Sequence, residues 1–462
     1  MTPPSRHPSR NWIFAAVVCL SICVGRQPAF ARQAGSADAA SAQFASELLA
    51  RAEVAWLDHH CDEVASLYRQ ALQLFPSNQK AAYRMGWCSN EQKDYVEAIG
   101  VLKDAVRLDP SDERARSELG FAYRKEKLFD EALAVYSDLL AVKPKSSEPY
   151  YSMGWIFNER GQFLEAIEAL KTAASLNEDR AEIYEDLGYA YRKVRRYDEA
   201  LAAYSRAARL EPERPGPLKT LGDIFFEDLK RFEDALVAYQ KAAGLDPTNA
   251  KVQRKLGRSL SELGRFQEAV PALRLAARAI PDDSGLYNEL GYVFRKLGEF
   301  EKAIEAYTQS HKLDSTSPVP YFGVGDVYFD LLRYQDAVDC YRSGLSLASE
   351  DGIGNRSLGA AYNALGKHQD AIPPLRQAIR SLPNDVEASI ELGIALDGAG
   401  LTQEAIAVFQ MALQLGPESA DARFRLGLAL LKTGDVNAVE AEYHALQNLR
   451  SPLADKLLDA IR

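Results

Sequence analysis

The sequence predicts an all-α solenoid made of about twelve stacked helix pairs. The octapeptides ELGFAYRK, DLGYAYRK and ELGYVFRK begin at residues 118, 186 and 289. The first two are separated by two periods of 34 residues, and the last two by three such periods and one extra residue. A glycine recurs at the same period, as Gly86, Gly120, Gly154, Gly188, Gly222, Gly257, Gly291, Gly325, Gly359, Gly393 and Gly427. A fixed period of this length indicates a repeat array in which each repeat is one supersecondary unit.

Each repeat contains two amphipathic segments whose small residues mark a close contact between helices. An alanine such as Ala132 follows most of the glycines by twelve residues, and a ring or leucine such as Tyr136 stands four residues further on. Apolar residues recur at helical spacing, and a proline often ends the second helix. Because Ala235 follows Gly222 by thirteen residues, the extra residue is expected in the turn at 227–232.

This series of glycine, tyrosine, alanine, ring and proline resembles the tetratricopeptide repeat (TPR) family. The resemblance covers residues 45–451 as twelve repeats of 34–35 residues, and it implies a right-handed superhelix with a concave groove. Ala52 and Val64 depart from the pattern in the first repeat, and Val439 departs from it in the last. Residues 452–462 predict a C-terminal capping helix with a polar face, which an open stack needs for solubility.

The N-terminus predicts export. Arg6 and Arg10 precede a short apolar stretch at 13–25, and Ala29 and Ala31 form a small-residue cleavage site. These features are typical of a secretory signal peptide at 1–31, followed by a short linker at 32–44. The alternative is an uncleaved N-terminal anchor. We therefore expect a periplasmic or extracellular protein with no stable membrane span in its mature part.

The composition argues against nucleic-acid binding, and the arrangement of the chain argues against catalysis. The net charge of −10 is the opposite of the basic face that nucleic acids require. Few residues of the mature chain lie outside the repeats, so we expect no catalytic domain, no cofactor and no enzyme.

Two cysteines lie near the expected contact between the first two repeats. The adjacent His59, His60 and Cys61 make a poor metal site, because neighbouring ligands rarely share one ion well. A disulfide between Cys61 and Cys88 is the other option, since exported proteins retain such bonds. Cys340 would then remain free.

In the related family the groove is lined by the second, fifth, sixth, ninth, twelfth and thirteenth positions of each repeat. The ninth position is aromatic in four successive repeats. The twelfth and thirteenth positions carry a basic pair in the repeats of the three octapeptides, and acidic or polar pairs in several neighbours. The candidate groove residues are Trp87, Phe121, Arg124, Trp155, Tyr189, Arg192, Phe226, Tyr292, Arg295 and Phe329.

Two interpretations are open for each kind of groove residue. The rings either stack on one another and tighten the array, or they offer apolar area to a ligand. The arginines either form weak ion pairs between neighbouring first helices or present forked donors to carboxylates or backbone carbonyls of a ligand.

The function predicted from the sequence is an exported, non-catalytic scaffold. It is expected to bind an extended peptide segment or partner protein in the groove of repeats 2–6. The alternative is an accessory protein that binds carbohydrate, in polysaccharide export or cell-envelope assembly. The sequence leaves open the identity of the partner, the oligomeric state and the state of Cys61 and Cys88.

Overall fold

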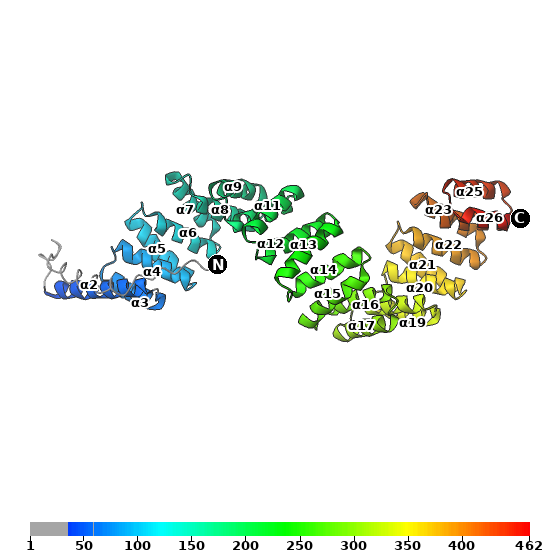
Figure 1. Cartoon of the computed structure of the whole chain (residues 1–462), viewed down its shortest axis with the longest axis horizontal. Helices are drawn as coiled ribbons and strands as arrows, with labels where there is room; N and C mark the ends of the chain where they lie inside the picture. The colour runs from blue at the N-terminus through cyan, green and yellow to red at the C-terminus, as the bar shows by residue number, and fades with distance from the viewer. Residues whose placement is uncertain (1–35, 59) are drawn as a thin grey trace. The chain divides into compact units, whose positions relative to one another are not determined.

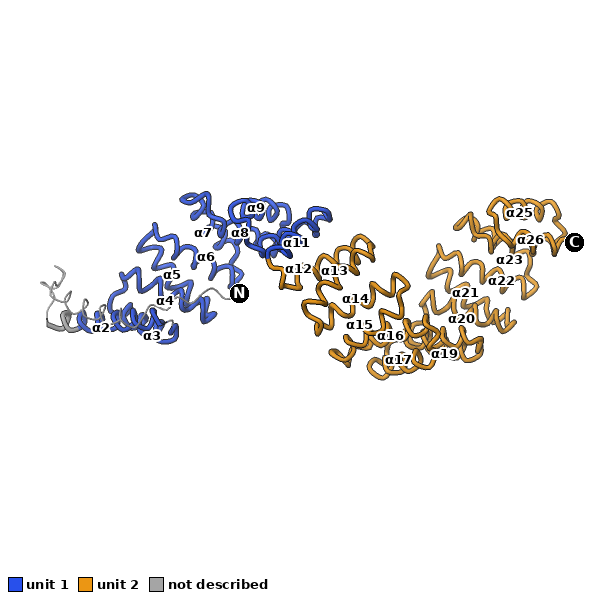
Figure 2. The backbone as a smooth tube through the Cα atoms, in the orientation of Figure 1, with its two compact units in different colours: residues 1–210 blue, residues 211–462 orange. Residues whose placement is uncertain are grey.

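The computed structural model describes residues 36–58 and 60–462, and throughout this part the regular elements are helices without strands. The predicted signal peptide at 1–31 lies outside the described residues. The chain forms two compact units (Figure 2). The N-terminal unit ends at Leu210, and the C-terminal unit begins at Glu211.

The N-terminal unit consists of consecutive antiparallel helix pairs, in which each first helix packs on its second helix and on the next pair (Figure 1). Its helices are α2 (Ser36–Leu57), α3 (Cys61–Leu74), α4 (Gln79–Glu91), α5 (Tyr95–Leu108), α6 (Glu113–Lys125), α7 (Phe129–Val142), α8 (Ser147–Glu159), α9 (Phe163–Leu176), α10 (Ala181–Lys193) and α11 (Tyr197–Leu210). In this numbering the even helices are the first helices of the repeats.

The C-terminal unit continues the same pattern through the end of the chain. Its helices are α12 (Pro215–Asp223), η2 (Ile224–Asp228), α13 (Phe232–Leu245), α14 (Ala250–Glu262), α15 (Phe266–Ala279), α16 (Ser284–Lys296), α17 (Phe300–Leu313), α18 (Val319–Asp330), α19 (Tyr334–Leu347), α20 (Gly352–Ala364), α21 (His368–Ser381), α22 (Val386–Gly398), α23 (Thr402–Leu415), α24 (Ala420–Thr433), α25 (Val436–Asn448) and α26 (Leu453–Ile461).

The helices begin and end where local chemistry requires it. Asn78 and Asp112 accept hydrogen bonds from backbone N–H groups of the first turns of α4 and α6. These contacts satisfy donors that a helix cannot satisfy internally. The tight turn inside a pair needs one residue with positive φ, which is Gly161 after α8 but Lys127 after α6.

A close fit between a glycine and a ring holds the two helices of a pair together. A Cβ placed on Gly120 of α6 would lie 2.7 Å from Cε1 of Tyr136 on α7. Tyr136 is only 2% exposed, so its ring fills the space that the missing side chain leaves. Gly86 is covered in the same way by Leu102. This fit explains why a glycine and a large apolar residue recur sixteen residues apart.

The last repeat uses a different element for the same contact. A Cβ on Gly427 of α24 would lie 2.7 Å from Leu457 of α26. Ala454 and Leu457 of α26 are buried against the cluster of the last pairs. The terminal helix thus supplies the residue that covers the glycine.

Two sequence expectations differ from the structure. The linker predicted at 32–44 is helical from Ser36 onward, because the segment SADAASAQFA is rich in alanine and lacks glycine and proline. The extra residue predicted in the turn at 227–232 is accommodated earlier, in the π-helix η2, where Leu229 N–H donates to the Ile224 carbonyl. A π-turn adds one residue while keeping the backbone hydrogen-bonded.

Among the described residues, no helix combines the length and the apolar character needed to cross a membrane.

The glycine–ring fit makes a testable prediction about stability. Gly120→Ala should lower the free energy of unfolding by about 1–3 kcal/mol, because its methyl group overlaps the buried Tyr136 ring. Gly100→Ala is the matched control, since a Cβ on exposed Gly100 of α5 meets no atom within 4 Å. This control should be more stable by roughly 0.5–1 kcal/mol, because alanine favours a helix. Urea unfolding of both variants measures the difference, and equal midpoints would refute the fit.

Candidate functional site

The four successive rings predicted at the ninth position lie on the first helices α4, α6, α8 and α10 of the N-terminal unit (Figure 1). Trp87, Phe121 and Trp155 are half-buried, and Tyr189 is 40% exposed. Each ring therefore retains surface that a ligand can contact. Tyr189 is among the large apolar or aromatic side chains that the fold leaves exposed.

These rings do not stack on one another, so that part of the interpretation is wrong. Each instead makes an edge contact with a different ring on an earlier helix. Trp87 lies 4.9 Å from Trp56 of α2, measured between ring centroids. The same kind of contact, at 6.1–6.4 Å, holds Phe121, Trp155 and Tyr189 against Tyr95, Phe129 and Phe163, the first residues of α5, α7 and α9. The preceding second helix thus orients the rings of Phe121, Trp155 and Tyr189, and the first helix α2 orients Trp87.

Arg124 on α6 is held between two of these rings. Its guanidinium carbon lies 5.4 Å from the centroid of Phe121 and 5.1 Å from that of Trp155. Its Nε is shielded from solvent without an acceptor, and among the described residues no carboxylate pairs with Arg124. A guanidinium stacked on rings keeps its in-plane N–H donors available. The ion pair considered for this arginine is therefore absent.

Arg295, which has the same position in its octapeptide, is paired with carboxylates of the fold. Its guanidinium forms ion pairs with Asp326 and Asp330 of α18, the first helix of the next pair. For Arg295 the interpretation as a free donor for a ligand is wrong, because these two aspartates take up its N–H groups. Arg192 on α10 is half-buried and also has an interaction partner.

Asparagines at the twelfth position link successive first helices. Asn90 Nδ2 donates to the backbone carbonyl of Glu118 at 3.1 Å and to its carboxylate at 2.8 Å. Asn158 Nδ2 donates to the backbone carbonyl of Asp186 at 3.0 Å. Both asparagines are buried. The sequence signal for this link is a separation of 28 residues between the asparagine and the next acidic sixth position, and spacing within one repeat does not reveal it.

The candidate residues of the C-terminal unit have mixed environments. Phe226 is only 5% exposed and packs against Phe232, so the prediction that it contacts a ligand is wrong. It belongs to the π-helix η2, and it is covered further by the Arg258 guanidinium. Phe329 is half-buried against Tyr334.

Tyr292 borders a small hollow between α14 and α16. The ring is 42% exposed, and the hollow has a volume of about 230 Å³. Its lining consists of Arg258, Ser261, Glu262, Asn288, Glu289 and Tyr292, which all occupy groove positions of two neighbouring repeats. Arg258 and Asn288 were not among the predicted site residues.

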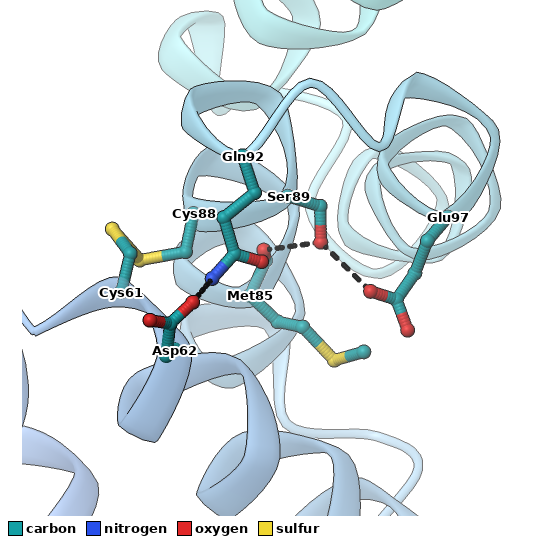
Figure 3. The surroundings of a disulfide bond; sticks show 7 residues. All are labelled: Cys61, Asp62, Met85, Cys88, Ser89, Gln92 and Glu97. Carbon is teal, nitrogen blue, oxygen red and sulfur yellow. Dashed lines mark hydrogen bonds between the residues drawn. A yellow bond between two sulfur atoms is a disulfide. The ribbon is translucent and has the colours of Figure 1, made fainter.

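A disulfide joins Cys61 of α3 to Cys88 of α4, with their Cα atoms 5.0 Å apart (Figure 3). Beside it, the Gln92 side chain donates to Asp62 at 2.6 Å, and the Ser89 hydroxyl is hydrogen-bonded to Glu97. The bond and the Gln92–Asp62 contact tie the first repeat to the second. Cys340 is a free cysteine on α19, and burial raises the pKa of its thiol to about 11.

No group of three or more residues able to hold a metal ion occurs within residues 36–58 and 60–462.

Burial raises the pKa values of two carboxyl groups on the first helices. Burial raises the pKa of Asp186 to about 6, although a hydrogen bond with Tyr151 and the charge of Arg124 act in the opposite direction. Burial also raises the pKa of Glu118, and the hydrogen bond from Asn90 opposes that shift. The sixth-position carboxyl groups thus lie within the packing between the first helices.

Comparisons with known proteins identify the repeat. A family model described as the cilia and flagella-associated protein 70 C-terminal domain matches residues 110–317. A model described as tetratricopeptide repeat matches residues 49–113, 324–386, 365–420 and 390–446. No curated protein sequence matches the chain.

Several solved structures are similar to parts of this chain. The APC/C hetero-tetramer Cut9–Hcn1 is 16% identical over 84% of this chain and 96% of that chain, with a TM-score of 0.44. YrrB, described as a TPR protein with an unusual peptide-binding site, is 24% identical over 41% of this chain and 98% of its own, with a TM-score of 0.36. MamA from Desulfovibrio magneticus RS-1 is 23% identical over 36% of this chain and 94% of its own, with a TM-score of 0.35.

The raised pKa of Asp186 predicts a pH dependence of stability. The folded state favours the protonated carboxyl, so the stabilisation is complete below the ordinary pKa of 3.8 and is lost as the pH rises through about 6. Asp186→Asn removes this titration and keeps an acceptor for Tyr151. At pH 7 it should therefore be more stable than the wild type by on the order of 2 kcal/mol, with no gain at pH 3.5.

Urea unfolding at a series of pH values measures this effect. Asp138→Asn, at an exposed position on α7, is the control and should leave the pH profile unchanged. A constant difference between Asp186→Asn and the wild type from pH 3.5 to 7 would show that burial does not perturb this carboxyl.

Proposed function

The chain belongs to the tetratricopeptide repeat family, and we propose that it is a non-catalytic scaffold that binds an extended peptide segment of a partner protein. The proposed surface consists of the first helices α4, α6, α8 and α10 of the N-terminal unit. One observation carries the proposal: four successive first helices each present a partly exposed ring at the same position.

The contact between the two helices of a pair does not require the rings. The glycine beside each ring already forms the contact within its pair, as Gly120 does with Tyr136 and Gly154 does with Leu170. A polar residue at the next position would leave that contact unchanged. Repeat solenoids use the surface of such successive helices for binding. Partly exposed aromatic side chains and arginine are also the residues enriched at the energetic centres of protein interfaces.

Arg124 supports a polypeptide ligand. Its Nε has no acceptor among the described residues, and Phe121 and Trp155 restrict the guanidinium. An arginine restricted before binding loses less conformational entropy when it donates to a backbone carbonyl or carboxylate. Rings on both sides of this donor fit a chain that offers alternating apolar and polar groups.

Export is the second part of the proposal. The signal-peptide pattern at 1–31 supports it, and so does the Cys61–Cys88 disulfide, since such bonds persist in oxidising compartments. Mass spectrometry of the protein from its native cell should give a mature chain that begins at Arg32. A chain that retains residues 1–31 would instead support the anchor.

The proposal predicts which variants lose binding. Peptides are first selected on the wild-type protein from a random-sequence display library and then titrated by calorimetry. Trp87→Ala and Trp155→Ala should each weaken binding by roughly tenfold to thirtyfold, because each removes one apolar anchor. The control is Leu164→Ala, which truncates a side chain that is 64% exposed on the second helix α9.

The control should bind the peptides as the wild type does. Loss of binding in Leu164→Ala, with normal binding in both tryptophan variants, would place the ligand on the second helices instead. Neutral oligosaccharides are titrated in parallel, because rings of this kind also stack on sugars. Saturable binding of oligosaccharides without binding of peptides would replace the peptide scaffold by the carbohydrate role.

A further inference from the structure

The last residues of the four first helices form a row of charges with alternating sign. Helices α4, α6, α8 and α10 end at Glu91, Lys125, Glu159 and Lys193. All four side chains are exposed, and each follows the ring of its helix by four residues. Residues four apart lie on the same face of a helix, so each ring has one charge beside it. We call these four residues the charge row.

The charge row forms no ion pairs with the described part of the fold. None of its four members forms an ion pair with another described residue. Lys125 and Lys193 instead lie over the rings of Phe121 and Tyr189, at 5.3 and 5.2 Å from the centroids. The ring restricts each lysine and leaves its ammonium group without a carboxylate. Within the part of the chain that the structure describes, no ion pair therefore links neighbouring first helices through this row.

The two glutamates stand where the helix itself disfavours them. The C-terminus of a helix carries partial negative charge from unpaired carbonyl groups, so a cation is stabilising there and an anion is not. Lys125 and Lys193 satisfy this rule, whereas Glu91 and Glu159 break it. Residues that break a local rule without a gain for folding are typical of functional surfaces. The alternation is thus not explained by helix stability.

The spacing of the row matches an extended chain. The helices α4, α6, α8 and α10 contact one another in succession. Packed helices lie about 8–10 Å apart, and an extended chain advances about 3.3 Å per residue. One repeat therefore corresponds to about three residues of an extended ligand.

We propose that the N-terminal unit selects an extended partner segment whose charge alternates in sign about every three residues. Basic side chains of the segment face Glu91 and Glu159, and acidic side chains face Lys125 and Lys193. Its apolar residues contact the rings that lie beside these charges. This inference rests on the proposed function, because it assumes that a peptide occupies the row of rings.

Charge complementarity also excludes simpler partners. A uniformly acidic segment would meet Glu91 and Glu159, and a uniformly basic one would meet Lys125 and Lys193. Like charges in apposition suppress the wrong partner, so the row acts as a filter for sequence pattern rather than for net charge.

The test compares synthetic peptides of about twelve residues, which span four repeats at about three residues each. One peptide carries Lys and Asp alternately at every third position. A second has the same composition with its two lysines followed by its two aspartates, and a third has four aspartates. Serine and leucine fill the other positions in all three. Fluorescence anisotropy at low ionic strength measures binding, because salt screens exposed charges.

The wild type should bind the alternating peptide roughly fivefold to tenfold more tightly than the other two. The double variant Lys125→Glu/Glu159→Lys keeps the net charge but arranges the row as two acids followed by two bases. It should prefer the second peptide by a similar factor. Glu159→Gln alone should reduce the difference in affinity between the alternating peptide and the other two. This single variant gives a readout that does not depend on how well the double variant folds.

The outcomes separate this inference from the proposed function. Equal binding of the first two peptides by the wild type and by the double variant would overturn the charge filter. The scaffold would survive that result if Trp155→Ala still weakens both peptides. Tighter binding of the four-aspartate peptide by the wild type would overturn the filter as well. Failure of the wild type to bind any of the three peptides, or any peptide from the display library, would overturn both proposals.

Discussion

The close fit between a glycine of the first helix and a ring or leucine of the second helix is the contact on which the structure depends. It occurs in successive pairs of both units, for example between Gly188 and Tyr204 and between Gly393 and Phe409. Because this fit holds the two helices of a pair together, the ninth and thirteenth positions of the first helix are not needed for that contact. The surface of the first helices can then vary from repeat to repeat while the fold stays the same.

Neighbouring repeats determine the role of an arginine that two similar motifs share. ELGFAYRK in the N-terminal unit and ELGYVFRK in the C-terminal unit place an arginine at the same position. Arg124 meets the ring of Trp155 on the next first helix, whereas Arg295 meets Asp326 and Asp330. The first arrangement leaves donors for a ligand, and the second neutralises the guanidinium inside the fold. Function in such an array therefore depends on the pair of repeats and not on one motif.

The period, the helix pairs and the contact residues of the fold were predictable from the sequence, because a glycine and a ring or leucine recur at a nearly constant spacing. The candidate site was only partly predictable. Residue spacing placed the four aromatic side chains on successive first helices, but it did not show that each ring would contact a ring of an earlier helix, as Trp155 contacts Phe129. The burial of Phe226 follows from the π-helix η2, which a single inserted residue does not reveal in advance.

The central claim is that the ends of the first helices are the binding surface, and covalent labelling of lysines tests it most directly. The free protein and its complex with the alternating peptide are treated briefly with an acetylating reagent, and the modified lysines are quantified by mass spectrometry. We expect Lys125 and Lys193 to react in the free protein and to be protected in the complex. Lys103 on α5 and Lys171 on α9 should react equally in both states. Protection of Lys103 and Lys171, with Lys125 and Lys193 still reactive in the complex, would contradict the account.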